Sequence, residues 1–296
     1  MEPIDFVYLG GCLLSAPVNE LLREGRLSWA LRRAGLRRAA AIYTLGEAIQ
    51  FTRFLRGDLD IPPEIRLLSD IDRDWVWQPQ WRACLAETDV VLVEINSPVP
   101  ICYGSYSLNR ASIITHIGEP LVARRPDLKA VANDWYYQGI MNANNEVRIE
   151  LGLRLADSVP DDMVNADLAR RIFTEAYGLR QKQEDFVEGI ALLRDIIGRP
   201  IIVVTAVHRY LPDGRRISYW SDAVDHTIAA AQTVGLPVFQ PSEVVTSYGL
   251  NRAMKEDLSH YREEFHPVLG AALYEAIAEV VKKDQSVVTR RIEAAE

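Results

Sequence analysis

The sequence is poor in cysteine and in long apolar runs, and each shortage excludes a class of protein. Its three cysteines, Cys12, Cys84 and Cys102, are an odd number without the spacing of metal ligands. The five histidines contain no His-x-x-x-His pair, so we expect neither a disulfide scaffold nor a bound metal. No uninterrupted apolar run approaches the roughly 18 residues of a membrane span. We therefore expect a cytoplasmic protein with reduced thiols and no membrane partner.

Positive charge is also in deficit. Lys and Arg together number 33 against 41 Asp and Glu, which gives a formal net charge of −8. An acidic chain of this kind repels phosphate backbones, so nucleic acid is not an expected partner. The 296 residues, of which 48% are hydrophobic, are enough for one large buried core, and we expect a single α/β domain over 1–296.

The first residues resemble a lipoprotein signal only at their end. Leu9-Gly10-Gly11-Cys12 matches the small-residue box that precedes a lipidated cysteine, but such a signal also requires a basic region and an apolar stretch. The chain opens with two acids, Glu2 and Asp5, and has no base before position 12. We therefore expect Cys12 to be part of the folded domain.

Short apolar runs, rich in Val and Ile and followed by turn residues, predict strands that are buried on both faces of a parallel sheet. Helical patterns between them predict right-handed crossovers. Together they predict a three-layer α/β/α sandwich with a mostly parallel, five-stranded, flavodoxin-like sheet. The runs are 4–9, 39–44, 89–95, 201–207 and 236–239.

Helices are predicted at 18–31, 221–233 and 268–281, the last of which has a continuous apolar face. The stretch between the third and fourth runs, 98–199, is much longer than a simple crossover requires. We expect it to form a helical insertion or cap, with helices near 143–155, 162–178 and 180–197.

Polar and small residues follow the predicted strands, where functional groups of open parallel sheets gather. They are Cys12, Gly46, Asn96 and His208. Cys12 precedes a predicted helix, whose positive end favours the thiolate and makes the residue a candidate nucleophile. The alternatives are a buried, inert thiol, or Ser15 as the nucleophile three residues later.

Asp257 and His260 are spaced so that one segment supplies a carboxylate and the imidazole that it orients. The alternative is a solvated pair at the start of the final helix. His266 is the second candidate base, and His208 and His266 are candidate substrate contacts.

Asn96 offers a side-chain amide to a developing oxyanion, beside the backbone N–H groups of Cys12 and Gly46. The alternative is a turn-forming Asn ahead of Ser97-Pro98.

The order of these blocks resembles the SGNH/GDSL hydrolase superfamily. A nucleophile follows the first strand, Gly46 the second and Asn96 the third, and a D-x-x-H block precedes the closing helix. In that family the D-x-x-H block supplies the catalytic Asp and His, which would be Asp257 and His260 here.

Two blocks depart from the family pattern. The family nucleophile is Ser in Gly-Asp-Ser, where this chain has Gly11-Cys12. The third family block is Gly-x-Asn-Asp, where this chain has Glu94-Ile95-Asn96-Ser97. The Gly-Cys variant resembles divergent branches associated with acyl transfer in bacterial polysaccharide biosynthesis.

The resemblance implies acyl-group chemistry, as an acyltransferase or an esterase or thioesterase, through a Cys-His-Asp triad. The expected partners are a small-molecule acyl donor and acceptor. No cofactor is expected to be required, and acyl-CoA is the candidate donor. Two alternatives stay open: a catalytically inert binding or accessory protein on the same fold, and a Cys–His enzyme of unrelated chemistry.

Overall fold

The computed structural model describes residues 2–36, 40–207, 218–258 and 260–293. For Cys12 and for residues 218–220 and 287–293 it describes the backbone alone.

The centre of the molecule is a five-stranded parallel sheet with the strand order β2-β1-β3-β7-β8. This confirms the predicted flavodoxin-like sheet. Every residue of β3 and β7 is buried, as expected of central strands that are covered on both faces. The strands are β1 (Ile4–Leu9), β2 (Leu27–Trp29), β3 (Val90–Ile95), β7 (Ile201–Thr205) and β8 (Val238–Phe239).

The prediction for the second strand is wrong. Within 39–44, residue 39 lies outside the described residues, and the rest forms only an isolated bridge between Ala41 and Gly10. The edge strand is instead Leu27–Trp29, inside the segment predicted as a helix. Helix α1 (Cys12–Arg23) starts earlier than predicted and ends before Gly25, whose φ of +68° favours glycine. A three-residue edge strand is too short to show a period of two in the sequence.

Successive side chains of each strand face opposite sides of the sheet, and this divides the core into two layers. Val7 and Leu9 of β1 face one cluster, which contains buried residues of α2, α3, α5, α11 and α12. Phe6 and Tyr8 face the other, which contains residues of α1, α13 and α15. Helices on both faces of a parallel sheet make the predicted three-layer α/β/α sandwich.

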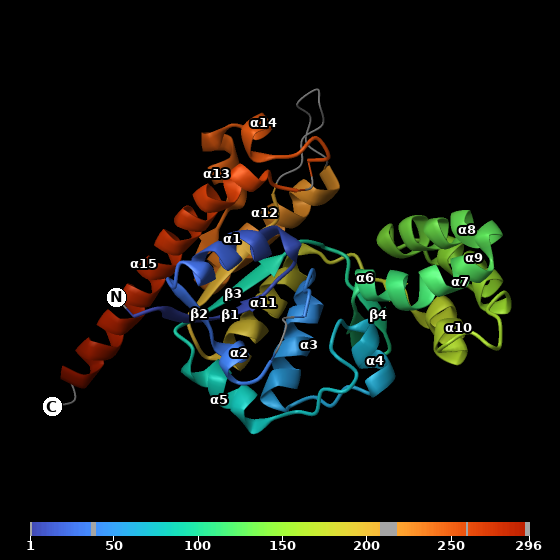
Figure 1. The fold of residues 1–296 in the computed structure, drawn as a ribbon, viewed down its shortest axis with the longest axis horizontal. Helices are drawn as coiled ribbons and strands as arrows, with labels where there is room; N and C mark the ends of the chain where they lie inside the picture. Colours follow the sequence, from blue (N-terminus) through green and yellow to red (C-terminus); the bar gives the residue numbers. More distant parts are fainter. Residues whose placement is uncertain (1, 37–39, 208–217, 259, 294–296) are drawn as a thin grey trace.

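The helices of the sandwich include the long final helix, which lies at one side of Figure 1. No helix in the described part of the chain is both long and apolar enough to cross a membrane. These helices are α1, α2 (Ala30–Arg33), α3 (Leu45–Arg56), α4 (Pro63–Leu68), α5 (Pro79–Glu87), α11 (Gln183–Ile197), α12 (Ser218–Val234), α13 (Pro241–Tyr248), α14 (Leu250–Ala253), η4 (Glu263–Phe265) and α15 (His266–Glu293).

Between β3 and β7 the chain forms a small antiparallel sheet, β5-β4-β6, that the sequence did not reveal. A group of helices from α6 to α10, here called the short-helix group, follows β5 and lies on the side opposite to α15 (Figure 1). The helix predicted at 162–178 ends at Glu175, and β6 begins two residues later. The elements are β4 (Ile101–Tyr103), β5 (Tyr106–Leu108), α6 (Arg110–Ile113), η1 (Ile114–Gly118), α7 (Glu119–Arg124), η2 (Pro126–Leu128), α8 (Lys129–Asp134), η3 (Trp135–Met141), α9 (Asn145–Asp157), α10 (Ala166–Glu175) and β6 (Tyr177–Gly178).

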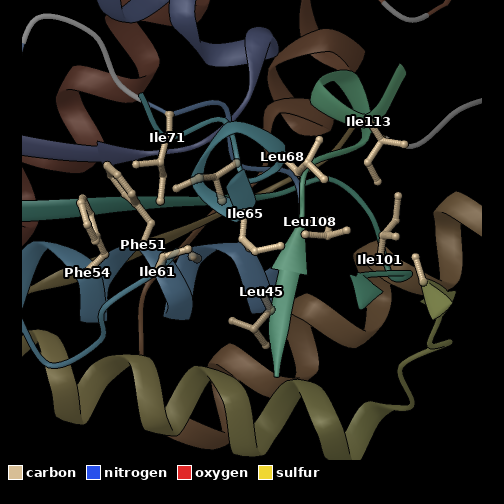
Figure 2. Close-up of a cluster of buried hydrophobic side chains, with 14 of the residues drawn as sticks. Leu45, Phe51, Phe54, Ile61, Ile65, Leu68, Ile71, Ile101, Leu108 and Ile113 are labelled. Atoms are coloured by element: carbon tan, nitrogen blue, oxygen red, sulfur yellow. The ribbon is translucent and has the colours of Figure 1, made fainter. Parts of the chain in front are cut away.

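The helix that ends the 98–199 stretch, α11, packs against α3 and α12, and its buried side chains belong to the same apolar cluster as residues of β3 and β7. The small antiparallel sheet shares a core with the sandwich. Figure 2 shows Ile101 of β4 and Leu108 of β5 in the same cluster as Leu45 and Phe51 of α3. Burial of these side chains joins the two parts of the chain through apolar contact.

Asn109 adds a polar connection at the same boundary. Its side chain is fully buried, and its Nδ2 donates to the Ala41 carbonyl (2.7 Å) and to Glu47 Oε1 (3.0 Å). Its Oδ1 accepts from the Ser112 N–H (3.1 Å) and so caps α6. One amide therefore ties the start of the short-helix group to the residues around the start of α3.

We expect Asn109→Ala to lower the free energy of unfolding by about 2 to 4 kcal/mol, because it removes a helix cap and leaves buried polar groups without partners. Asn144 is the matched control, since its exposed side chain caps α9 through a single bond from the Val147 N–H. Asn144→Ala should cost about 1 kcal/mol. Urea denaturation measures both, and equal losses would contradict the connecting role of Asn109.

Candidate active site

A cavity of about 560 Å³ lies at the carboxyl ends of the central strands. Its walls come from the ends of β3 and β7, the starts of α1 and α3, the loop before α15, and the short-helix group. The lining residues are Leu13, Tyr43, Thr44, Glu47, Asn96, Ser97, Val99, Ile101, Leu108, Arg110, Ala111, Ile114, Thr115, Tyr136, Met141, Ala206, Val207, Met254, Leu258 and His260. A largely apolar cavity with a few polar groups at this edge of the sheet is the expected place for a ligand.

The D-x-x-H segment contributes an oriented imidazole to this cavity. His260 Nδ1 lies 2.6 Å from Asp257 Oδ2, and the His260 backbone N–H donates to Asp257 Oδ1 (3.1 Å). With the carboxylate as acceptor, the proton resides on Nδ1, which leaves the Nε2 lone pair free to take up a proton. Both side chains are about half exposed. The pair therefore has the geometry that a general base requires.

The loop that carries this pair is held at both ends. Met254 and Tyr261 form an antiparallel bridge, and the Lys255 N–H donates to the His260 carbonyl (2.8 Å). Leu258 has a φ of +51°, which is unusual for a residue with a bulky side chain. Local backbone strain of this kind is typical of functional sites, and Leu258 lines the cavity beside His260.

Asn96 lies at the end of β3 and packs against the turn that precedes α1. A Cβ at Gly11 would come within 2.9 Å of Asn96 Nδ2 and 2.8 Å of the Tyr43 ring, so only glycine fits. The Asn96 side chain is buried, and its Nδ2 donates to Glu94 Oε1 (2.9 Å). Asn96 and His260, which the sequence analysis singled out separately, line the same cavity.

Glu94 is a residue at this site to which the sequence analysis assigned no role. It is buried, and its carboxyl group accepts from the Gly11 N–H (2.9 Å) and from the Leu14 N–H in the first turn of α1. The Tyr8 hydroxyl lies within hydrogen-bond distance of Glu94 Oε2. Burial raises the pKa of Glu94, while these hydrogen bonds act in the opposite direction. Its one signal in the sequence is a charged residue inside the apolar run of β3.

Glu47 is the second buried carboxyl group of the site, and it lines the cavity itself. Its Oε2 accepts from the backbone N–H groups of Tyr43 (2.8 Å) and Thr44 (2.7 Å), and its Oε1 from Asn109. The Thr44 hydroxyl caps α3 in return, by accepting from the Glu47 N–H (3.2 Å). This capping box fixes the wall of the cavity beside Asn96.

Two of the predicted residues fall outside the described part of the structure. His208 lies wholly outside it, and so does the side chain of Cys12, although the Cys12 backbone begins α1. The next residue, Leu13, lines the cavity. Ser15 lines a different cavity of about 330 Å³, on the other side of Tyr43.

Gly46 and His266 are not among the described residues that line the cavity. Gly46 lies in the first turn of α3, where a Cβ would come within 2.5 Å of Ser107 Oγ, so the absence of a side chain there has a packing reason. His266 begins α15. No group of three His, Cys, Asp or Glu side chains in the described residues is arranged to hold a metal ion.

Among the described residues, Arg110 lines the cavity on the side of the short-helix group and brings a positive charge to it. Its guanidinium lies over the rings of Tyr136 and Tyr137, 5.0 and 5.6 Å from their centroids, and donates to the Tyr137 hydroxyl (2.9 Å). Aromatic faces hold this charge in place without neutralising it.

Comparison with family models matches residues 4–276 to the TviD N-terminal domain. The match covers most of the chain, including both halves of the cavity. The chain belongs to this family. Asn96, Asp257 and His260 all lie within the part that defines it.

Comparison with curated proteins finds no match. Among solved structures, the chain is similar to one described as a peptidoglycan O-acetylesterase, with 10% sequence identity and a TM-score of 0.34. The similarity covers 70% of this chain and 42% of that one, so the chain spans less than half the length of this relative.

Glu47 should make stability depend on pH. Burial raises its pKa from 4.5 to about 7, against the hydrogen bonds from Tyr43, Thr44 and Asn109. Because the folded state has the higher pKa, it retains a proton that the unfolded chain releases above 4.5, and this stabilisation is lost as the pH rises through about 7. The corresponding free energy is of the order of 3 kcal/mol.

We therefore expect the free energy of unfolding to fall more steeply in the natural protein than in Glu47→Gln between about pH 5 and about pH 8. Urea denaturation across this range measures both slopes. Parallel pH profiles would show that Glu47 does not titrate there.

Proposed function

We propose that this domain transfers or hydrolyses acyl groups in the cavity, with Cys12 as nucleophile, His260 as base and Asp257 as the carboxylate that orients it. The observation that carries the proposal is the 2.6 Å contact between His260 Nδ1 and Asp257 Oδ2 in the wall of a cavity that Asn96 also lines. The family supports it, because the TviD N-terminal domain is related to a Vi antigen O-acetyltransferase.

The proposed reaction has two steps. His260 Nε2 accepts the Cys12 thiol proton, and the sulfur attacks the acyl carbonyl to form a C–S bond. The leaving alkoxide or thiolate takes the proton from His260. An acceptor hydroxyl, amine or water then gives a proton to His260 and attacks the thioester, and the returning proton restores the Cys12 thiol. A thioester reacts readily with amines, which favours transfer over hydrolysis.

Stabilisation of the oxyanion is assigned to Asn96 and to backbone N–H groups of Cys12 and Gly46. Both backbone groups lie in first helical turns, where N–H groups have no partner within the helix and the dipole favours negative charge. Removal of one such donor typically slows an acyl transfer by about 10²- to 10³-fold.

The substrates we propose are a small-molecule acyl donor and acceptor, with acyl-CoA as the candidate donor and no required cofactor. Arg110 would bind an anionic group of one of them, because its charge faces the cavity and aromatic rings hold its orientation. His208 and His266 stay candidate substrate contacts. A cytoplasmic location and a role in bacterial polysaccharide biosynthesis belong to the same proposal.

The alternative, an inert binding or accessory protein, is favoured by one observation. The Asn96 amide already donates to Glu94, and the Glu94 carboxyl group occupies the N-terminal turn of α1, where it competes with a substrate oxyanion. Reactivity of Cys12 separates the two proposals.

We expect iodoacetamide to label Cys12 much faster than Cys84 and Cys102. Cys84 and Cys102 serve as internal controls, because both are partly buried and burial raises the pKa of each thiol. Incubation with a panel of acyl-CoA and activated esters should give a covalent adduct in the mass spectrum that Cys12→Ala abolishes. Equal, slow labelling of all three thiols and no adduct would favour the binding protein.

His260→Ala should slow formation of the adduct by about 10²-fold or more, because it removes the base. His266→Ala tests the second candidate base, since His266 lies six positions further along the chain and is not among the described residues that line the cavity. Rates come from the time course of the adduct mass, and thermal melts check that both variants fold. An unchanged rate in His260→Ala would exclude it as the base, and a slow rate only in His266→Ala would transfer the role.

A further inference from the structure

The two buried glutamates of the site differ in what surrounds them. Glu47 has three partners, Tyr43, Thr44 and Asn109, and each has a proton to donate. The ionised form of Glu47 can therefore accept a hydrogen bond from each of them. Glu94 instead shares the Tyr8 hydroxyl with the Gly11 carbonyl oxygen, which has no proton. This difference determines which form of Glu94 fits the observed contacts.

The Tyr8 hydroxyl has one proton, and at least two acceptor oxygens lie within hydrogen-bond distance of it. The Gly11 carbonyl oxygen is 2.7 Å away, and Glu94 Oε2 is also within hydrogen-bond distance. With Glu94 ionised, a single proton would have to serve two acceptors, and one oxygen–oxygen contact would be left without a hydrogen. With a proton on Oε2, Glu94 donates to Tyr8 and Tyr8 donates to Gly11, so both contacts are hydrogen bonds.

The contacts of Glu94 with Asn96 and with the Gly11 N–H are also compatible with the protonated form. Oε1 still accepts from the Asn96 amide (2.9 Å), and the second lone pair of Oε2 still accepts from the Gly11 N–H (2.9 Å). Glu94 thus behaves as a donor to Tyr8 and as an acceptor for the turn and the amide.

Among the described residues, no positive side chain forms an ion pair with Glu94. Its ionisable neighbour on β1 is Tyr8, and the side chain of Cys12 on α1 lies outside the described residues. Its neighbour on β7 is Val204, and the buried residues that α15 adds to this layer are apolar. The N–H groups of α1 favour its ionised form, but burial has the larger effect and raises its pKa.

We propose that Glu94 is kept as a neutral carboxylic acid in the folded protein near neutral pH, and that it is a positioning residue for the Asn96 amide and the Gly11 turn. Asn96 has two ways to orient its amide, and only one places Nδ2 against Glu94 Oε1. The other would set Asn96 Oδ1 against that oxygen. The acid therefore determines which way the amide faces the cavity.

The neutral form has a consequence that rests on the proposed function. A carboxylate in the first turn of α1 would cancel the positive end of the helix dipole next to Cys12. A carboxylic acid leaves most of that potential in place, so the turn keeps its attraction for an anion. The inert alternative was favoured because the Glu94 carboxyl group competes with a substrate oxyanion for the first turn of α1. A neutral acid would not repel that oxyanion by charge.

Infrared difference spectroscopy of the whole protein tests the protonation. The natural protein minus Glu94→Gln, at about pH 7, should show the carbonyl band of a protonated carboxylic acid. Tyr8→Phe should keep this band but shift its frequency, because the acid loses its acceptor. Glu47→Gln is the matched control, and the band that it removes should give way to a carboxylate band as the pH rises through about 7. A carboxylate band in place of the acid band at Glu94 would overturn the proposal.

Positioning is tested by the side-chain amide resonances of Asn96 in a nitrogen–proton NMR spectrum. We expect Glu94→Gln to move them strongly, since the glutamine must present either a donor or an acceptor where Oε1 was. Unmoved resonances would overturn the positioning role. If Glu94→Gln does not fold, Tyr8→Phe reports on the same hydrogen bonds with a smaller change, and it should move these resonances less.

Both spectra are independent of activity, so they succeed or fail separately from the acyl-transfer proposal. Where that proposal holds, Glu94→Gln should lower kcat by about 10²-fold with little change in KM, because the oxyanion donors are misplaced while the cavity is intact. A change in KM alone would contradict a positioning role in the reaction.

Discussion

The buried carboxyl group of Glu94 is the interaction on which the organisation of the site depends. It joins three elements that meet at the carboxyl edge of the sheet: β3, which carries it; β1, through Tyr8; and α1, through the N–H groups of Gly11 and Leu14. A polar group so deep in an apolar layer is tolerable only because its oxygens have hydrogen-bond partners. Those bonds hold the Gly11 turn against Asn96, and this contact in turn forms one end of the cavity.

The opposite wall depends on a second polar connection. Asn109 links the short-helix group to Glu47 and Ala41, while Ile101 and Leu108 extend the apolar core of the sandwich beneath it. The helical residues between β3 and β7 therefore do more than cover the sheet. They bring Arg110, Tyr136 and Met141 to the cavity, and so supply a positive charge and part of its apolar surface. A ligand in this cavity would contact both parts of the chain.

The orientation of the polar side chains in these walls determines which chemistry the cavity can support. Asp257 holds the His260 ring through Nδ1, and the bridge between Met254 and Tyr261 closes the loop that carries both. Asn96 donates through Nδ2 to Glu94, the residue that we propose orients its amide. Membership of the TviD N-terminal domain family agrees with acyl-group chemistry in such a site. An oriented imidazole and a buried amide in one cavity are two of the groups that the proposed chemistry requires, and Cys12 is its proposed nucleophile.

The sequence by itself determined the layer architecture and four of the five central strands, because buried parallel strands leave continuous Val- and Ile-rich runs such as those of β3 and β7. It also pointed to Asp257 and His260, whose partnership is local in the chain. It did not reveal β2 or the β5-β4-β6 sheet, since strands of two or three residues leave no periodic pattern. The strand β8 is as short, but the longer apolar run 236–239 indicated it. Only the tertiary structure decided that Glu94 underlies the Gly11 turn and that Asn96 and His260 line one cavity. Those contacts join residues more than 80 positions apart, and such proximity is set by packing of the whole sheet rather than by any local preference.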